Sequence, residues 1–201
     1  MKNKFIFGPV PSRRLGRSLG VDIVPSKICT LDCVYCEVGK TTDLTCAKSR
    51  FFEPAEVVAE FEREYAKLKG SIDVVTITGS GEPTLNEALA EIAGGIKKIS
   101  SHPLAILTNS TTMTDKRVRD SLMLFDIVVP SLDAATQKVF NRVNLPASGL
   151  EIEEINNALV SFTNSFEGKV FLEVLLVKGI NDDKAELARI AEVIKKCRYT
   201  M

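Results

Sequence analysis

The sequence lacks several features that would assign it to other classes of protein. No apolar run approaches the roughly 18 residues needed to span a bilayer. Near the start, the apolar residues 5–7 stop at Gly8 and Pro9, which is too short for the core of a signal peptide. The 26 basic residues equal the 26 acidic ones in number, so charge gives no argument for a polyanionic partner. We therefore expect a cytoplasmic protein with no membrane partner.

The sequence also has few histidines and no regular pattern of cysteine pairs. His102 is the only histidine, and three of the five cysteines lie within eight residues of each other. This distribution does not suit a framework of disulfides, and it favours a reducing compartment. The other two, Cys46 and Cys197, are far apart in the sequence and too few to hold a second iron–sulfur cluster. We expect both to be ordinary free cysteines.

The length and composition are those of a globular domain. With 201 residues, of which 45% are hydrophobic and 26% are charged, the chain can form one domain with one core. We expect a single domain over residues 1–201, in which residues 1–18 form a turn-rich N-terminal extension.

The three clustered cysteines are the strongest signal. Cys29, Cys33 and Cys36 are spaced C-x3-C-x2-C directly after a strand-like run over residues 19–24 that ends at Pro25. Because proline cannot donate to a strand ladder, the thiols are expected on the loop that leaves the strand. Three thiolates on one loop suit a [4Fe–4S] cluster whose fourth iron has no protein ligand and is open to an exogenous molecule.

Two other interpretations of the cysteines remain open at this point. A structural zinc site needs four protein ligands, so His102, Cys46 or Cys197 would have to complete it, and the chain would then be a zinc-stabilised binding module. Alternatively, the cluster serves a non-enzymatic electron carrier.

Strand-like and helix-like segments alternate along the rest of the chain. Apolar residues at helical spacing after Pro54 predict a helix over residues 54–68, and the run over residues 73–78 predicts a second strand. This alternation predicts an α/β fold of parallel strands joined by right-handed crossovers. Further strands are expected at residues 104–107, 126–132 and 170–177, and further helices at residues 86–99, 115–124, 134–140, 150–162 and 183–196.

Polar residues gather where the predicted strands end. The turn over residues 79–82 follows the second strand, Asn109 follows the third and Ser131 ends the fourth. Parallel sheets bind ligands at the carboxyl ends of their strands, so these residues are expected to share one face with the cysteine loop. Ordinary turns and caps are the alternative for each of them.

The cysteine loop, with Tyr35 directly before its last cysteine, resembles the signature of radical S-adenosylmethionine (SAM) enzymes. The resemblance implies that the amino and carboxylate groups of SAM chelate the open iron. It implies that a flavodoxin- or ferredoxin-like reductant supplies one electron, and that SAM is cleaved to methionine and a 5′-deoxyadenosyl radical, which abstracts hydrogen from a substrate. It also implies a partial (β/α)6 TIM-like barrel instead of a flat doubly wound sheet.

The resemblance assigns roles in SAM binding as well. The turn over residues 79–82 is similar to the family's glycine-glycine-glutamate motif, which receives the SAM amino group, although a serine separates the two glycines. Ser131 matches a strand-four position that binds SAM in several members, and Arg142 follows it where a guanidinium can bind a carboxylate. The residues expected to bind SAM are Tyr35, Gly79, Ser80, Gly81, Glu82, Asn109, Ser131 and Arg142.

Residues 7–16 resemble the N-terminal signature of radical SAM enzymes related to those that build the wybutosine base of tRNA. The resemblance makes a tRNA base one candidate substrate, beside a partner protein that receives a glycyl radical and a small molecule that is rearranged. Arg13, Arg14 and Arg17 can bind phosphate or carboxylate groups, or pair with acidic side chains at the end of the barrel.

Only five residues follow the last predicted helix, too few for a complete sixth strand. The strand over residues 170–177 would then expose unpaired backbone groups at its edge. The tail, another subunit, or the missing part of a longer protein could cover that edge. We expect the last of these, because an incomplete wall would leave a radical intermediate open to solvent.

Overall fold

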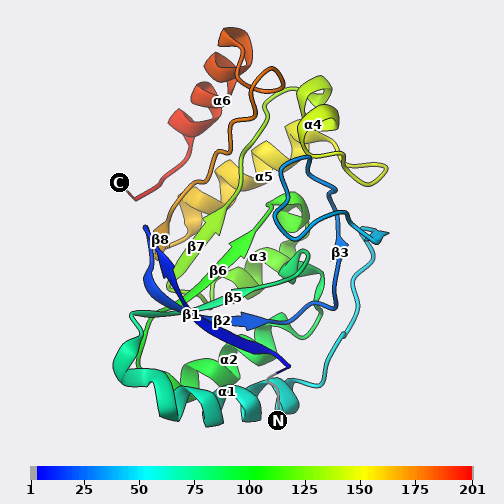
Figure 1. The fold of residues 1–201 in the computed structure, drawn as a ribbon. Helices are drawn as coiled ribbons and strands as arrows, with labels where there is room; N and C mark the ends of the chain where they lie inside the picture. Colours follow the sequence, from blue (N-terminus) through cyan, green and yellow to red (C-terminus); the bar gives the residue numbers. More distant parts are fainter. Residues whose placement is uncertain (1–3, 201) are drawn as a thin grey trace.

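The computed structural model describes residues 4–200, which form a six-stranded sheet with helices packed on one face (Figure 1). The strands lie in the order β1-β2-β5-β6-β7-β8; β1 is antiparallel to β2, and the others are parallel. Their bounds are β1 Ile6–Ser12, β2 Gly16–Asp22, β5 Val74–Thr78, β6 Leu104–Thr108, β7 Ile127–Pro130 and β8 Lys169–Val170. A separate short ladder joins β3 (Ile28–Cys29) to β4 (Asp43–Leu44).

Six α-helices connect or follow the strands. They are α1 Pro54–Leu68, α2 Leu89–Ile99, α3 Lys116–Leu122, α4 Gln137–Val143, α5 Ile152–Ser165 and α6 Lys184–Lys196. Short 3-10 turns at Lys69–Ser71, Pro83–Leu85 and Thr111–Thr114 complete the described elements. No helix among the described residues combines the length and apolar character that a membrane crossing requires.

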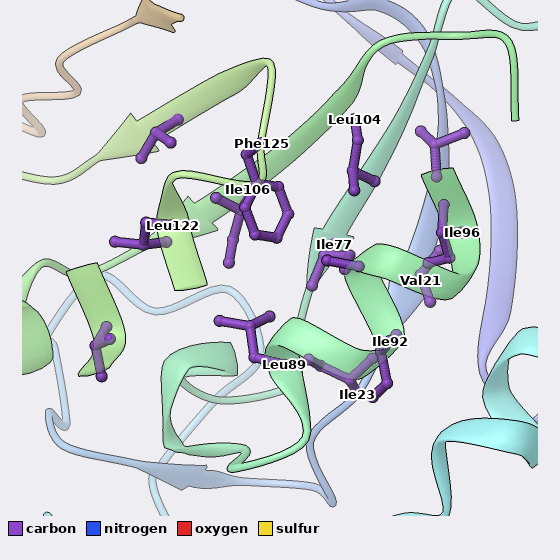
Figure 2. Packing of buried hydrophobic residues seen from close by; sticks show 14 of the residues in the cluster. Val21, Ile23, Ile77, Leu89, Ile92, Ile96, Leu104, Ile106, Leu122 and Phe125 are labelled. Carbon is purple, nitrogen blue, oxygen red and sulfur yellow. The ribbon is translucent and has the colours of Figure 1, made fainter. Parts of the chain in front are cut away.

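The core lies between the sheet and its helices. Strand side chains alternate between the two faces of a sheet, and on the helix-covered face they are apolar. Val21 and Ile77 from neighbouring strands pack with Ile92 and Ile96 of α2, and all four side chains are fully buried (Figure 2). Burial of this kind stabilises a fold by about 1.5–3 kcal/mol per large apolar side chain, so these positions define the fold.

The opposite face of the sheet is partly polar and partly open. Ser18 of β2 and Thr76 of β5 hydrogen-bond through their hydroxyls at 2.6 Å, and Leu107 and Val129 continue the same face on β6 and β7. These residues line a cavity of about 260 Å³ that Phe7 of β1 and Glu173, just after β8, also border. This face is the interior of a partial barrel, as the resemblance to radical SAM enzymes implies.

Most predicted elements are confirmed within a few residues. Helix α1 has the predicted bounds, with Pro54 in its first turn and Val57, Phe61 and Tyr65 buried along one side. The helix expected from residue 86 begins at Leu89 instead, because the turn Pro83–Leu85 comes first.

An additional strand occupies the segment for which turns are expected. Strand β1 pairs with β2 as a hairpin at the edge of the sheet, where prolines such as Pro9 and Pro11 are tolerated because one side of the strand needs no partner. Just before it, Glu60 of α1 accepts hydrogen bonds from the backbone N–H groups of Lys4, Phe5 and Ile6 at 2.8–3.0 Å. The N-terminal segment is therefore part of the sheet.

The predicted strand over residues 170–177 is mostly not regular. Strand β8 ends at Val170, although Phe171 N still donates to Val128 O at 3.0 Å and Glu173 N to Pro130 O at 2.9 Å. An isolated bridge pairs Glu173 with Ser131, just after β7. Beyond it the backbone turns to side-chain partners: Leu175 N donates to Asp133 Oδ1 at 2.9 Å, and Val177 N donates to Asn181 Oδ1 at 2.7 Å. Beyond Glu173 the prediction is wrong, because these polar side chains replace the ladder.

The two edges of the sheet approach each other without joining in a ladder. Arg14, in the turn between β1 and β2, forms an ion pair with Glu173 on the segment after β8. Figure 1 shows the tip of this blue hairpin near β8. The tail also reaches this edge, since Thr200 N donates to Val170 O at 2.8 Å. Thr200 thus contacts β8, and the remaining edge over residues 171–175 lies beside the hairpin.

Candidate iron–sulfur and SAM site

The cysteine loop is fixed to the segment that follows α4. Asp32 N donates to Asn144 O at 3.0 Å, Val34 N to Val143 O at 3.0 Å, and Ala147 N to Thr30 O at 2.9 Å. Figure 1 shows the blue loop after β2 beside α4, past the carboxyl ends of the central strands. The loop is therefore held on the face where a parallel sheet binds its ligands.

Each of the three sulfurs lies near a side-chain N–H donor. Lys27 Nζ is 3.0 Å from Cys36 Sγ, and Asn144 Nδ2 is 3.2 Å from Cys33 Sγ. Asn109 Nδ2 is 3.6 Å from Cys29 Sγ, which is a longer contact. Such donors stabilise sulfur in its thiolate form, the form that binds iron.

Burial acts in the opposite direction on two of the thiols. It raises the pKa of Cys29 to about 12, helped by the nearby Glu82 carboxylate, while Lys27 opposes the rise. Burial also raises the pKa of Cys33, against the hydrogen bond from Asn144. Since metal binding requires thiolates, iron has to displace protons from buried sulfurs here.

Tyr35 belongs to a buried polar network beside Cys33. Its hydroxyl donates to Asp133 Oδ2, and Asn144 Nδ2 donates to the same oxygen at 3.0 Å. Burial, followed by the charge of Asp133, raises the pKa of Tyr35, and burial raises that of Asp133. The backbone of Leu175 completes the network. The aromatic before the last cysteine thus ties the cysteine loop to β7 and to the segment after β8.

The glutamate of the turn after β5 is turned inward. Glu82 is 2% exposed, and its Oε1 accepts from Thr84 N at 3.1 Å, Thr84 Oγ1 at 2.6 Å and Thr108 Oγ1 at 2.8 Å. Its Oε2 accepts from Asn109 N at 2.7 Å. Burial raises its pKa, while these donors lower it. The carboxylate therefore links the ends of β5 and β6 in the described structure.

Gly81 lies so close to the cysteine loop that no larger residue fits there. A Cβ at this position would lie 1.7 Å from Ile28 O, immediately before Cys29, and Glu82 N donates to that same oxygen at 3.1 Å. The glycine therefore lets the turn and the cysteine loop touch through their backbones. Gly79 is likewise tight, since a Cβ there would lie 2.9 Å from Val24 Cγ2.

Ser80 is held by a residue that the sequence analysis did not identify. Asp22, at the end of β2, accepts from Ser80 Oγ at 2.6 Å and from Ser80 N at 3.1 Å. It also accepts from Val24 N at 3.0 Å. Its position in the sequence could have indicated a role at the site, because it is an aspartate at the carboxyl end of the first parallel strand.

The remaining residues predicted to bind SAM differ in their distance from the cysteine loop and in their exposure. Asn109 joins the cysteine loop, because its Nδ2 donates to Thr30 Oγ1 at 2.8 Å. Ser131 is half-buried at the end of β7 and pairs with Glu173. Arg142 is exposed and donates to Gly179 O at 3.0 Å. The structure thus brings Asn109 to the cysteine loop and turns Arg142 toward a neighbouring loop.

The other cysteines and the histidine lie apart from the loop. Cys46 is exposed, and Cys197 is buried at the end of α6, where its Sγ lies 3.5 Å from Val193 O. His102 precedes β6 and bonds to Tyr65 OH at 2.7 Å. It lies at the amino end of the sheet, whereas the cysteine loop lies at the carboxyl end.

The arginines near the N-terminus mostly pair with acids. Arg17 binds Asp73 through two side-chain hydrogen bonds, which lower the pKa of that carboxyl to about 2. Arg14 pairs with Glu173, whereas Arg13 makes no ion pair among the described residues. Arg13 borders a surface hollow of about 900 Å³ between the hairpin, Glu37 and residues 172–175. This hollow opens beside the cysteine loop at the gap in the barrel.

The cysteine loop suits a cluster with three protein ligands. All three thiols are half-buried and free, and each meets an N–H donor. Within residues 4–200, no group of three or more histidine, cysteine or acidic side chains is arranged around one metal ion. The cysteines of a cluster bind separate irons, so they need not converge on one point.

Comparison with known proteins agrees with this chemistry. The model of the Radical SAM superfamily matches residues 23–191, most of the described chain. The chain belongs to the Radical SAM superfamily. Its cofactors are accordingly a [4Fe–4S] cluster and SAM.

Individual relatives support the assignment at different levels. The chain is 39% identical over 193 residues to a UPF0026 protein of Helicobacter pylori, covering 95% of this chain and 62% of the relative. It is 26% identical over 178 residues to a probable dual-specificity RNA methyltransferase RlmN of Treponema denticola, covering 83% and 48%. A structure of TYW1 with a lysine–pyruvate adduct has a TM-score of 0.60 at 17% identity, covering 90% and 61%, and shares the fold.

The chain is shorter than these proteins. It spans 29% to 64% of the lengths of five curated relatives that are 33% to 39% identical to it.

Proposed function

We propose that this chain is the catalytic core of a radical SAM enzyme in which Cys29, Cys33 and Cys36 hold the cluster. The observation that carries the proposal is the set of three half-buried thiols on one loop, each facing an N–H donor at the carboxyl ends of parallel strands. With three protein ligands, one iron is left for SAM. When bound, the cluster supplies the electron that cleaves SAM to a 5′-deoxyadenosyl radical.

The chain's own residues have a positioning role in this proposal. We assign SAM to the surface formed by the turn over residues 79–82, Asn109 and Ser131, with Tyr35 and Arg142 at its border. Asn109 supports this assignment because it contacts both neighbours: its side-chain amide donates to Thr30 of the cysteine loop, and its backbone N–H donates to Glu82 of the turn. Within the turn, the backbone carbonyls of residues 79–81 are the better acceptors for the SAM ammonium, because four internal donors already engage the Glu82 carboxylate.

For the substrate we propose a base of a structured RNA, with tRNA as the first candidate. The relatives named as RNA methyltransferases and the fold shared with TYW1 support this choice. The hollow beside Arg13, at the gap in the barrel, is where such a substrate would approach, since guanidinium groups bind phosphates. A flavodoxin- or ferredoxin-like protein in a reducing cytoplasm would supply the electron.

The first experiment tests the chemistry. Anaerobically reconstituted protein should be brown, contain about four irons per chain, and form 5′-deoxyadenosine from SAM when dithionite is added. Alanine in place of Cys29, Cys33 or Cys36 should abolish cluster retention, while Cys46→Ala should retain it. Colourless protein that keeps stoichiometric zinc would favour a zinc-stabilised module. A stable cluster that never cleaves SAM would favour an electron carrier.

A second experiment tests the substrate. Addition of unmodified tRNA should increase 5′-deoxyadenosine formation, and nucleoside mass spectrometry should detect a changed base. Equal product formation with and without RNA, with no altered nucleoside, would contradict the RNA proposal and leave the SAM chemistry intact. Arg13→Ala should weaken only the RNA-dependent part.

A further inference from the structure

Lys27 is a buried lysine beside the cysteine loop. The residue is 5% exposed, and in the described part of the chain it forms no ion pair with an acidic side chain. Its Nζ donates to Cys36 Sγ at 3.0 Å and to Thr41 Oγ1 at 3.3 Å. A lysine this deeply buried is rare unless an opposite charge compensates it.

The position of Lys27 is fixed by its backbone and by its neighbours. Its carbonyl accepts hydrogen bonds from Thr42 N at 3.1 Å, Asp43 N at 3.2 Å and Thr42 Oγ1 at 3.2 Å. Thr41 is itself held, since its hydroxyl donates to Leu31 O at 2.7 Å and its N–H donates to Asp32 Oδ1 at 2.6 Å. These hydrogen bonds therefore hold the ammonium next to the sulfur of Cys36.

The carboxylates near the loop are bound to groups other than Lys27. The Glu82 oxygens accept hydrogen bonds from Thr84, Thr108 and Asn109. Asp32 is engaged by the backbone of Thr41 and makes no ion pair with the lysine among the described residues.

We propose that Lys27 is the counter-charge of the iron–sulfur cluster and raises its reduction potential. The inference rests on the proposed function, because it needs the three cysteines to hold the cluster. Reduction adds one electron, and therefore one negative charge, to a site already surrounded by thiolates. A fixed cation 3.0 Å from a ligand sulfur stabilises the reduced state more than the oxidised state. Lys27 thus acts through its charge, which allows a weaker reductant to reduce the cluster.

The test is a redox titration of reconstituted protein, followed by electron paramagnetic resonance, with iron content measured alongside. Lys27→Met removes the charge at nearly constant volume, Lys27→Gln keeps an N–H donor without the charge, and Lys27→Arg keeps the charge. Lys40→Met is the matched control, because Lys40 is an exposed lysine on the same loop. Solvent and salt screen its charge.

The midpoint potential should shift to more negative values in both neutral variants, and stay near the wild-type value in the Lys27→Arg and Lys40→Met proteins. If the neutral variants lose iron while Lys27→Arg retains it, the positive charge is required for the cluster, which also supports the inference. An unchanged potential in a fully loaded Lys27→Met protein would overturn it, as would equal loss of iron in the arginine variant. Failure of the wild-type protein to hold a cluster would instead contradict the proposed function.

Discussion

Gly81→Ala should destabilise the protein by disrupting the contact between the turn after β5 and the cysteine loop. The new Cβ would lie 1.7 Å from Ile28 O and 2.6 Å from Ile28 C, whereas ordinary contacts begin near 3.4 Å. The two backbones must therefore separate by about 1.7 Å, the difference between these values. That shift would break the hydrogen bond from Glu82 N to Ile28 O.

The size of the effect follows from two terms. Overpacking in a tight interior costs about 1–3 kcal/mol, and loss of one hydrogen bond with a buried partner adds about 1 kcal/mol. We expect a loss of about 2–4 kcal/mol in the free energy of unfolding. Urea denaturation should show it as a midpoint lower by about 1–2 M, for a slope of about 2 kcal/mol per M.

Gly94→Ala is the matched control. Gly94 lies in α2, and a Cβ there meets nothing within 4 Å. Alanine should stabilise that helix by about 0.5–1 kcal/mol. A Gly81→Ala protein as stable as the wild type would refute the backbone contact that we describe. Reduced iron retention by the stable fraction of that variant would show that the strain reaches Cys29.

Three further predictions concern the polar residues around the site. Asn144→Leu removes the amide that contacts a cysteine sulfur, and should release iron to a chelator about tenfold faster than the wild type, as followed by absorbance. Glu82→Gln places an amide NH2 group against the backbone N–H of Asn109, and should lower the free energy of unfolding by about 1–3 kcal/mol in urea denaturation. An unchanged free energy of unfolding would mean that the carboxylate is protonated or does not form these hydrogen bonds. Asp73, whose pKa Arg17 lowers to about 2, should stabilise the fold above pH 4 and cease to do so as the pH falls toward 2. Melting curves of Asp73→Asn should lack that part of the pH dependence.

The order of elements could be predicted because local pattern and tertiary packing agree. The α1 residues Val57, Phe61 and Tyr65 recur at helical spacing and are buried together. The cysteines could be recognised because their chemistry depends on spacing within a single loop. Such signals are local, so one sequence suffices to read them.

What could not be predicted depends on partners distant in the sequence. Backbone pairing of the segment after β8 stops beyond Glu173, because Asp133 and Asn181 bind the backbone of Leu175 and Val177. Gly81 looks like a residue kept small for a ligand, but its neighbour is the backbone of Ile28. Lys27 looks like an exposed loop lysine until the fold brings Cys36 and Thr41 around it. In each case the deciding contact forms only in the folded chain.

Mössbauer spectroscopy of protein reconstituted with ⁵⁷Fe tests the central claim most directly, because it separates the iron that has no protein ligand from the other three. We expect about four irons per chain in a [4Fe–4S] cluster, and on addition of SAM a change in about a quarter of the signal while the rest stays constant. Four equivalent irons that do not respond to SAM would contradict it, since they would show that the protein ligates every iron and leaves none open.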